Sequence, residues 1–489
     1  MNLLQIHRLD NVAVALAPLE AGAALGGGLT ARETVAAGHK VALRPIASGQ
    51  NVVKYGCPIG RASRDIAAGE WVHVHNLKTG LTGPGRAVYR PVSCELAPVP
   101  AREFRGFLRP DGRAGVRNEL WILPLVGCVN GVAQSLAREN AGLAAGTVDG
   151  VYAFPHPYGC SQMDEDHART RTILAALAGH PNAGGVLVLG LGCENLTREQ
   201  FERELGDYDR DRVRILICQD ADDELAEGAR LLRELAAYAG RFARQPISVS
   251  KLVVGLKCGG SDGLSGVTAN PAVGAFSDSL VAQGGTAILT EVPEMFGAEE
   301  LLLGRCADEG LFRQAAAMVE ACKDDYTAHG QPVYENPSPG NKAGGITTLE
   351  EKSCGCVQKG GSAPVRGVLG YGETVRTPGL NLLSGPGNDL ISATALTAAG
   401  AQLVLFTTGR GTPFGAPAPT VKIATNTPLY ERKRRWMDFD AGPVARGETA
   451  EMCGARLMET ALVVCSGERT RSERAGYREI AILRGGVTL

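Results

Sequence analysis

The chain has 489 residues, a net charge of −2 and 44% hydrophobic residues, and this length predicts about three domains. The small net charge disfavours a nucleic-acid or membrane partner, because both favour a strongly basic surface. The first eleven residues, MNLLQIHRLDN, carry charges where a secretory signal has its apolar core. Pro18 and Glu20 interrupt the apolar stretch that follows. We therefore expect a cytoplasmic protein whose thirteen cysteines stay reduced.

The first region, residues 1–92, is predicted to be a small β domain. It contains the short β-type segments NVAVAL, HKVALRPI, NVVKYG and EWVHVHNL, which glycines and prolines separate. A proline-rich stretch at 90–101, RPVSCELAPVPA, is typical of a linker.

Two α/β regions are predicted to follow, at residues 104–246 and 250–489. In the first, the apolar runs LWILPLV, GVYAFPH, GVLVLGL and VRILIC alternate with helical patterns. The polar break RFARQPISVS separates it from the second, where KLVVGLKC, GTAILTEV and AQLVLFTT have the same strand character. The fold class is therefore α/β with mostly parallel sheets, preceded by the small β domain.

Cysteines follow several of the predicted strands. Cys128, Cys160 and Cys193 come just after three strands and are spaced by about one βα unit, and Cys258 ends a fourth strand. The carboxyl ends of parallel strands lie at one edge of a sheet, so these thiols can lie close together in the folded protein although they are far apart in sequence. Each has a glycine beside it and polar residues after it, which a cysteine that only packs in a core does not need.

Two interpretations of these thiols remain open from the residues alone. One is burial as small apolar side chains, and the other is a soft-metal or iron–sulfur site. We expect Cys160, Cys193 and Cys258 to be the metal-site thiolates, with Cys128 in reserve.

Histidines concentrate in the β domain. If residues 70–76 form a strand, Trp71, His73 and His75 share one face, where two imidazoles can bind a metal or an anion. Solvent-exposed histidines on an edge strand are the plain alternative. His39 and Lys54 add polar groups, and we expect this domain to cover a site on an α/β sheet.

Three glycine-rich loops are predicted in the last region: NPSPGNKAGGITTLEEKSCGC, GSDGLSGVTANPAVG and FTTGRGTPFG. Backbone N–H groups in such loops, with Lys342 and Arg410, suit a carboxylate or phosphate. Plain turns with surface polar residues are the alternative. Together the loops favour an anionic, hydroxylated small molecule as the ligand.

The strings GHKVAL, VKYG, YGCSQ, GLGCEN, LKCGGSDGLSGVTANP, LTEVPEMFGAE, ENPSPGNKAGGITTLEEKS and TTGRGTP resemble the altronate/galactarate dehydratase family over nearly the whole chain. The N-terminal segment resembles a SAF domain, which is a small β-clip module. EVPEMFGAE, VHVHN and the C-terminal GVTL are more similar to the altronate branch of the family.

The resemblance implies a hydro-lyase that converts D-altronate to 2-keto-3-deoxy-D-gluconate in hexuronate catabolism. It also implies an iron requirement, with manganese able to substitute and an iron–sulfur cluster possible. Under this hypothesis Lys342 and Arg410 hold the carboxylate, while Asp262, Asn270 and Asn336 hold the hydroxyls. The base or acid is one of His39, Lys54, His73 and His75. Galactarate, sulfolactate or a non-catalytic sugar-acid or iron–sulfur sensor are the alternatives, and a homodimer is the default expectation.

Overall fold

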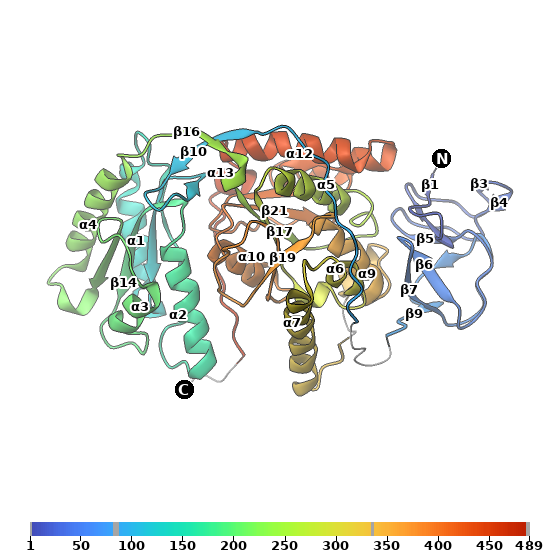
Figure 1. Cartoon of the computed structure of the whole chain (residues 1–489), viewed down its shortest axis with the longest axis horizontal. Coiled ribbons are helices and arrows are strands. Elements are labelled where there is room, and N and C mark those ends of the chain that lie inside the picture. The colour runs from blue at the N-terminus through green and yellow to red at the C-terminus, as the bar shows by residue number, and fades with distance from the viewer. Residues whose placement is uncertain (1, 82–87, 334–336, 486–489) are drawn as a thin grey trace.

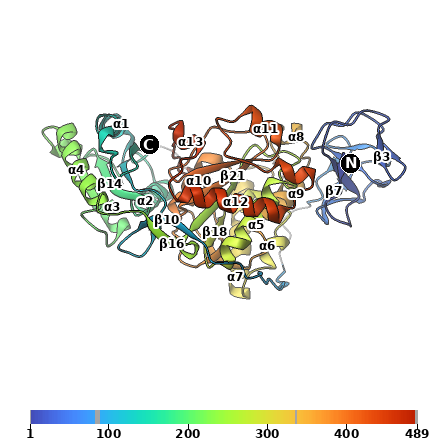
Figure 2. The ribbon, with the colours of Figure 1, turned by 90° about the horizontal axis from the view of Figure 1, so that it is seen from above.

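The computed structural model describes residues 2–81, 88–333 and 337–485, which form three domains in a row (Figure 1). The C-terminal domain lies in the middle, between the N-terminal β domain and the second domain (Figures 1 and 2). Order in space therefore differs from order along the chain. The expected fold class, a small β domain with α/β regions built on parallel sheets, is confirmed. Within the described ranges, every helix is too short or too polar to cross a membrane.

The N-terminal domain consists of short strands around a small apolar core that contains Val12, Val52, Ile59 and Val72. Its strands are β1 (Leu3–Leu4), β2 (Val12–Ala15), β3 (Ala24–Gly26), β4 (Leu29–Thr30), β5 (Lys40–Ala42), β6 (Asn51–Lys54), β7 (Cys57–Ala62), β8 (Trp71–Val72) and β9 (Leu77–Lys78). They pair as β1-β2-β5-β8, β6-β7-β9 and β3-β4.

The strand expected at 70–76 is wrong in its second half. Strand β8 ends at Val72, and a turn follows in which the backbone N–H of Asn76 donates to the carbonyl oxygen of His73. The Asn76 side chain closes this turn by accepting from the His73 N–H at 2.9 Å. A local bond between a side chain and the backbone competes with strand extension, which is why the alternating pattern did not decide the outcome.

The linker and the polar break both join neighbouring domains. Residues 90–101 contain no helix or strand and run along the C-terminal domain, where the Val92 N–H donates to the Gly304 carbonyl oxygen. The break before the last region contains strand β16 (Gln245–Ser248). This strand pairs with β10 (Glu103–Leu108), which pairs with β11 (Ala114–Gly115) in a small antiparallel sheet.

The second domain is a four-stranded parallel sheet in the order β13-β12-β14-β15. Its strands are β12 (Glu119–Pro124), β13 (Gly150–Ala153), β14 (Ala183–Gly190) and β15 (Val213–Ile217), and its α-helices are α1 (Asn130–Glu139), α2 (Asp164–Ala178), α3 (Arg198–Leu205) and α4 (Glu224–Ala239). Val186 and Val188 pack on the α2 side, whereas Leu187 and Leu189 pack on the side of α1 and α4. Both faces of β14 are thus covered, as its continuous apolar sequence predicts.

The C-terminal domain is a seven-stranded parallel sheet in the order β19-β20-β18-β17-β21-β22-β23. Its strands are β17 (Val253–Cys258), β18 (Thr286–Leu289), β19 (Val365–Leu369), β20 (Gly379–Leu383), β21 (Leu403–Thr408), β22 (Thr420–Ala424) and β23 (Phe439–Asp440). Its α-helices are α5 (Ala269–Ala282), α6 (Glu300–Leu303), α7 (Glu309–Ala328), α8 (Pro339–Ala343), α9 (Leu349–Cys356), α10 (Asp389–Ala398), α11 (Thr427–Arg432), α12 (Ala450–Cys465) and α13 (Arg471–Arg474). Helices α5 and α12 cover one face of the sheet and α10 covers the other (Figure 1).

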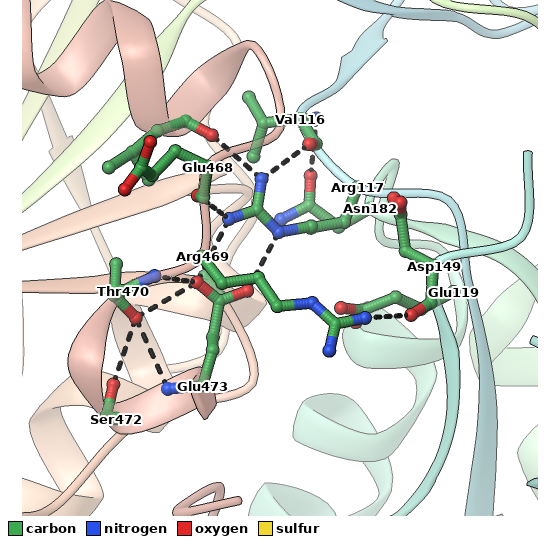
Figure 3. A network of polar contacts seen from close by, with 12 residues as sticks. Val116, Arg117, Glu119, Asp149, Asn182, Glu468, Arg469, Thr470, Ser472 and Glu473 are labelled. Carbon is green, nitrogen blue, oxygen red and sulfur yellow. Dashed lines mark hydrogen bonds and ion pairs between the residues drawn. The ribbon is translucent and has the colours of Figure 1, made fainter. Parts of the chain in front are cut away.

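A buried network of arginines and glutamates fixes the second domain to the C-terminal domain (Figure 3). Arg117 donates to both oxygens of Glu473, at 2.8 and 2.9 Å, and Arg478 bridges Glu473 to Glu119. Burial alone would raise the pKa of Glu473, but Arg117 and Arg478 lower it to about 2. This paired, hydrogen-bonded arrangement is what a charge needs in order to stay ionised away from water.

Candidate active site at the junction of two domains

Loops at the carboxyl edge of the seven-stranded sheet meet the N-terminal domain. The loop after β17 and the segment that contains α8 and α9 both contact Gly38, the residue before His39 and Lys40. Helix α9 faces the N-terminal domain in Figure 1. Ligands bind at this edge of an open parallel sheet, so the junction is the place to look for chemistry.

Two lysines of the N-terminal domain share one carboxylate of α9. Lys40 Nζ lies 2.8 Å from Glu351 Oε2, and Lys54 Nζ lies 2.9 Å from Glu351 Oε1. All three side chains are buried. Two ammonium groups cannot both be neutralised by one carboxylate, and burial lowers the pKa of Lys40 to about 8. Burial would raise the pKa of Glu351, but the two lysines lower it to about 2.

His39 and His73 lie beside this triad, with their rings 5.0 Å apart. Burial, and then the charge of Lys40, lower the pKa of both imidazoles, that of His73 to about 4. Both rings are therefore neutral at pH 7 and have one nitrogen that can accept a proton. His39 and His73 contact Ala343 and Thr347 of the C-terminal domain, and their predicted acid–base role stays a prediction.

The hydrogen bonds of the two rings differ. The Trp71 indole N–H donates to His39 Nδ1 at 3.1 Å, and His39 Nε2 faces the Ala343 carbonyl oxygen at 3.4 Å. Because an indole can only donate, the neutral His39 ring carries its proton on Nε2, and both nitrogens are used by the protein. His73 Nδ1 lies 3.3 Å from Thr347 Oγ1, which also accepts from Lys40.

The other predicted acid–base residues have different surroundings. His75 is exposed in the turn and contacts the Trp71 ring, in a group with Glu33 and Glu70 on the surface of the N-terminal domain. The structure does not bring it to the junction. Lys54 is at the junction but is buried against Glu351, and Glu351 raises its pKa against the effect of burial, so it is a fixed cation.

Lys342 and Arg410 lie on adjoining segments. Lys342 is in α8, and Arg410, at the end of β21, donates to the Gly340 carbonyl oxygen of the same helix at 3.4 Å. Arg410 is exposed and Lys342 is half-buried. His39 contacts Ala343, the residue after Lys342. Helix α8, which carries Lys342, therefore contacts both His39 and Arg410 through its backbone, and carboxylate binding by the two cations stays a prediction.

Asp262 and Asn270 hold the loops of the site in place. Asp262 accepts hydrogen bonds from the side chains of Ser265, Thr425 and Asn426, and therefore connects the loops after β17 and β22. Asn270 is buried, donates to the Gly355 carbonyl oxygen and accepts from Thr407. Both amide ends of Asn270 are occupied by the protein, so its predicted contact with a ligand hydroxyl is not what the structure shows. Asn336, also predicted to bind hydroxyls, lies outside the described residues.

A second buried cluster lies at the same edge of the sheet. Cys258 ends β17, Cys356 ends α9, and Glu294 follows β18; their ligand atoms all lie within 4.8 Å of one another. The two sulfurs are 3.5 Å apart, and Cys356 donates to Glu294 at 3.2 Å. Two sulfurs and a carboxylate form a donor set that suits a divalent transition metal.

Three lysines surround this cluster. Lys359 donates to Cys258 Sγ at 3.0 Å, Lys352 pairs with Glu294 at 2.7 Å, and Lys257 pairs with Glu291. The hydrogen bond from Cys356, followed by the charge of Lys359, holds the pKa of Cys258 well below its usual value. Lys352 lowers the pKa of Glu294 to about 2 although burial would raise it. Cys258 and Glu294 are thus favoured in the deprotonated state that metal binding requires, whereas the hydrogen bond to Cys258 and burial raise the pKa of Cys356 well above its usual value, so Cys356 has to release its proton to a bound metal.

Cys160 and Cys193 do not belong to the cluster of Cys258, Cys356 and Glu294. They follow β13 and β14 of the four-stranded sheet, whereas Cys258 belongs to the seven-stranded sheet. Among the described residues, the groups with metal-ligand spacing include Cys258 but neither Cys160 nor Cys193. The expected set of three thiolates is therefore corrected: strand ends converge only within one sheet, and these cysteines come from two.

Comparison with known proteins shows the family. The family model described as D-galactarate/altronate dehydratase, C-terminal, matches residues 249–488. The second-domain model of D-galactarate dehydratase/altronate hydrolase matches 106–240, and the altronate/galactarate dehydratase SAF domain matches 1–80. The chain belongs to the altronate/galactarate dehydratase family.

Similarity to individual family members extends over whole chains. Altronate dehydratase of Escherichia coli (strain K12) is 52% identical, with 100% of both chains covered. Altronate dehydratase of Bacillus subtilis (strain 168) is 50% identical, with 99% of both covered. Galactarate dehydratase (L-threo-forming) of Escherichia coli (strain K12) is 35% identical, with 98% of this chain and 96% of that protein covered. The resemblance to the altronate branch of the family is confirmed.

Most of the buried charges of this dehydratase family member were not predicted from the sequence: Lys40, Lys257, Glu291, Glu294, Glu351, Lys352 and Lys359. A signal existed for some of them. Glu294 lies in EVPEMFGAE and Glu351 in TTLEEKS, two of the strings that carry the family resemblance. Glu291 also has a left-handed backbone, with φ of 71°, a conformation that is strained for glutamate and concentrates at functional sites.

Proposed function

We propose that this protein is a hydro-lyase that removes water from D-altronate and forms 2-keto-3-deoxy-D-gluconate. The observation that supports the proposal is the junction, where His39 contacts α8, the helix of Lys342, which Arg410 also contacts, and where the His73 ring lies beside His39. Identity of 50–52% to the two altronate dehydratases supports this substrate over galactarate.

Lys342 and Arg410 are proposed to bind the substrate carboxylate. Dehydration begins with loss of the proton next to that carboxylate, which creates negative charge on its oxygens. An ammonium and a guanidinium lower the energy of this charge, and the guanidinium also fixes the orientation of the carboxylate.

His73 is proposed to take the proton. Thr347 Oγ1 accepts from Lys40 and lies 3.3 Å from His73 Nδ1, and the proposal assigns the His73 tautomer in which Nδ1–H donates to this oxygen. This bond places the free lone pair of the neutral ring on Nε2, where it can act as a base. His39, whose two nitrogens are both engaged, is a positioning residue that fixes Trp71 and the Ala343 carbonyl beside it.

Iron is the proposed metal, and Cys258, Cys356 and Glu294 are proposed to hold it. Their thiolate-rich donor set fits iron better than manganese, and it is linked to the junction by Lys352, which contacts both Glu294 and Asn341. A bound divalent ion supplies the Lewis acidity that the departing hydroxide requires.

A cytoplasmic location is proposed because all thirteen cysteines are free in the structure, including exposed ones. The homodimer expected from the sequence stays a prediction.

The test is an assay for 2-keto acid formation with ferrous iron and either D-altronate or galactarate. We expect turnover of D-altronate and a loss of kcat of about 10²- to 10⁴-fold in His73→Asn. Turnover of galactarate alone would replace the proposed substrate. Tight binding of D-altronate without turnover would favour the sensor and overturn the enzymatic proposal.

A further inference from the structure

Every strand of the four-stranded sheet in the second domain is followed by a cysteine. Along the sheet order β13-β12-β14-β15 these are Cys160, Cys128, Cys193 and Cys218, each within seven residues of its strand end. Because the strands are parallel, all four lie at the same edge. Cys128, Cys160 and Cys193 are exposed, and the other ten cysteines of the chain are buried or half-buried.

Hydrogen bonds tie together the loops that carry three of these cysteines. The N–H of Gly127, next to Cys128, donates to Tyr158, and the carbonyl oxygen of Gly159, next to Cys160, accepts from Leu196. The N–H of Ser161 donates to Asn195 Oδ1 at 2.8 Å, which ties the Cys160 loop to the Cys193 loop. No loop from another strand separates them.

The backbone around Cys160 adopts conformations and contacts that most residues do not allow. Ser161, directly after Cys160, is left-handed with φ of 55°. A Cβ atom on Gly159 would lie 1.9 Å from the Leu125 carbonyl oxygen, so this loop packs where only glycine fits. The buried carboxylate of Glu194 accepts from the N–H groups of Leu191 and Gly192 and fixes the turn before Cys193. The fold thus maintains an exposed position for thiols that packing alone would bury.

We propose that Cys128, Cys160 and Cys193 bind an iron–sulfur cluster, separate from the Cys258 site. Ligands of a single metal ion lie close together, since a metal–sulfur distance of about 2.3 Å keeps two thiolates within about 4 Å of each other. Among the described residues, the groups with such spacing do not include these three cysteines. Sulfurs on neighbouring strand ends are spread more widely, as the several irons of a cluster require.

Three thiolates leave one iron of a four-iron cluster without a cysteine, and each thiol releases its proton as it binds. Cys218 does not complete the set, because it packs against the apolar core on the α1 and α4 side of the sheet, and burial raises the pKa of its thiol to about 11. It is therefore the matched control. The inference does not rest on the proposed function.

The test uses full-length protein reconstituted anaerobically with equal amounts of ferrous and ferric iron and with sulfide, and iron, acid-labile sulfide and visible absorbance are measured. We expect about four sulfides per chain in the wild type and in Cys218→Ser. Cys128→Ser/Cys160→Ser/Cys193→Ser should lose this sulfide and keep its circular dichroism and Tm, because the three side chains are exposed. Iron at the Cys258 site binds without sulfide and does not interfere. Absence of sulfide from the wild type, or its retention in the triple variant, overturns the proposal.

Discussion

Lys40 and Glu351 form a wholly buried ion pair, 2.8 Å long, that joins two domains, and the two residues are 311 positions apart in sequence. The same carboxylate also binds Lys54, so that one α9 side chain holds two strands of the N-terminal domain. His73 and Thr347 complete the contact. The junction therefore depends on buried charges that stabilise it together, because each charge is unfavourable in the interior when its partner is missing.

Glu351→Gln should destabilise the protein by about 3–5 kcal/mol, because it leaves two buried ammonium groups without a counter-charge. Differential scanning calorimetry measures this as a lower Tm. The control is Glu459→Gln, which breaks an exposed pair with Arg102 and should cost less than about 1 kcal/mol. Equal Tm values for the two variants would show that the triad does not hold the domains together.

His39→Gln and His73→Asn should differ in activity although their rings are adjacent. We expect a fall in kcat of about 10²- to 10⁴-fold for His73→Asn, since it loses the proposed base. His39→Gln should reduce kcat less, because glutamine can still accept a hydrogen bond from Trp71. His75→Gln, in the exposed turn, is the control and should retain wild-type kcat/KM. A larger loss at His39 than at His73 would reverse the assigned roles.

The pH profile of kcat/KM should be wide. With the pKa of His73 lowered to about 4 and that of Lys40 lowered to about 8, activity should fall below about pH 4 and above about pH 8. Lys40→Arg should move the alkaline limb to higher pH, because a guanidinium keeps its proton there. An acid limb near the ordinary histidine pKa of about 6.5 would contradict a buried neutral His73.

The stability of the junction should also depend on pH. The pKa of His73 is about 4 in the folded protein and about 6.5 when unfolded, so between these values the unfolded chain binds the additional proton. The contribution of His73 to the free energy of unfolding is therefore fully present above pH 6.5 and is lost as the pH falls towards 4. Tm measured across this window should fall more steeply in the wild type than in His73→Asn, and parallel curves would rule out this contribution.

Removal of Cys356 should weaken iron binding. Cys356→Ala deletes one of three proposed ligands, and we expect a drop in iron affinity of at least about 10-fold in sulfide-free protein. Cys354→Ala, two residues earlier in the same buried helix, controls for packing and should bind iron normally. Chelation should abolish wild-type activity and added Fe²⁺ should restore it; full activity in chelated protein would refute the metal requirement.

Glu473→Gln should loosen the second domain from the C-terminal domain, because it removes the shared partner of Arg117 and Arg478. We expect a loss of about 3–5 kcal/mol, measured by urea unfolding. Glu468→Gln, which breaks an exposed pair with Arg474, should have little effect.

The sequence predicted the sheets well because continuous apolar runs, such as the one around Val186–Leu189, must be buried on both faces. It did not predict the burial of Glu351 and Lys352. A helix that begins Leu-Glu-Glu-Lys is typical of a solvent-exposed surface, and the counter-charges of Glu351 come from another domain. Cys160 and Cys258 have the same strand-end pattern, and spacing alone could not show that they belong to different sheets.

The position of the N-terminal domain has a consequence for how the site is assembled. Among the described residues, this domain shares no sheet with the C-terminal domain, and its contacts there are made by side chains and loop backbone. The groups that meet at the junction therefore come from the two domains, and the covalent connection holds these domains near each other. A version of this protein divided into two polypeptides after the first domain would retain every group at the junction, with its activity dependent on the concentration of the smaller piece.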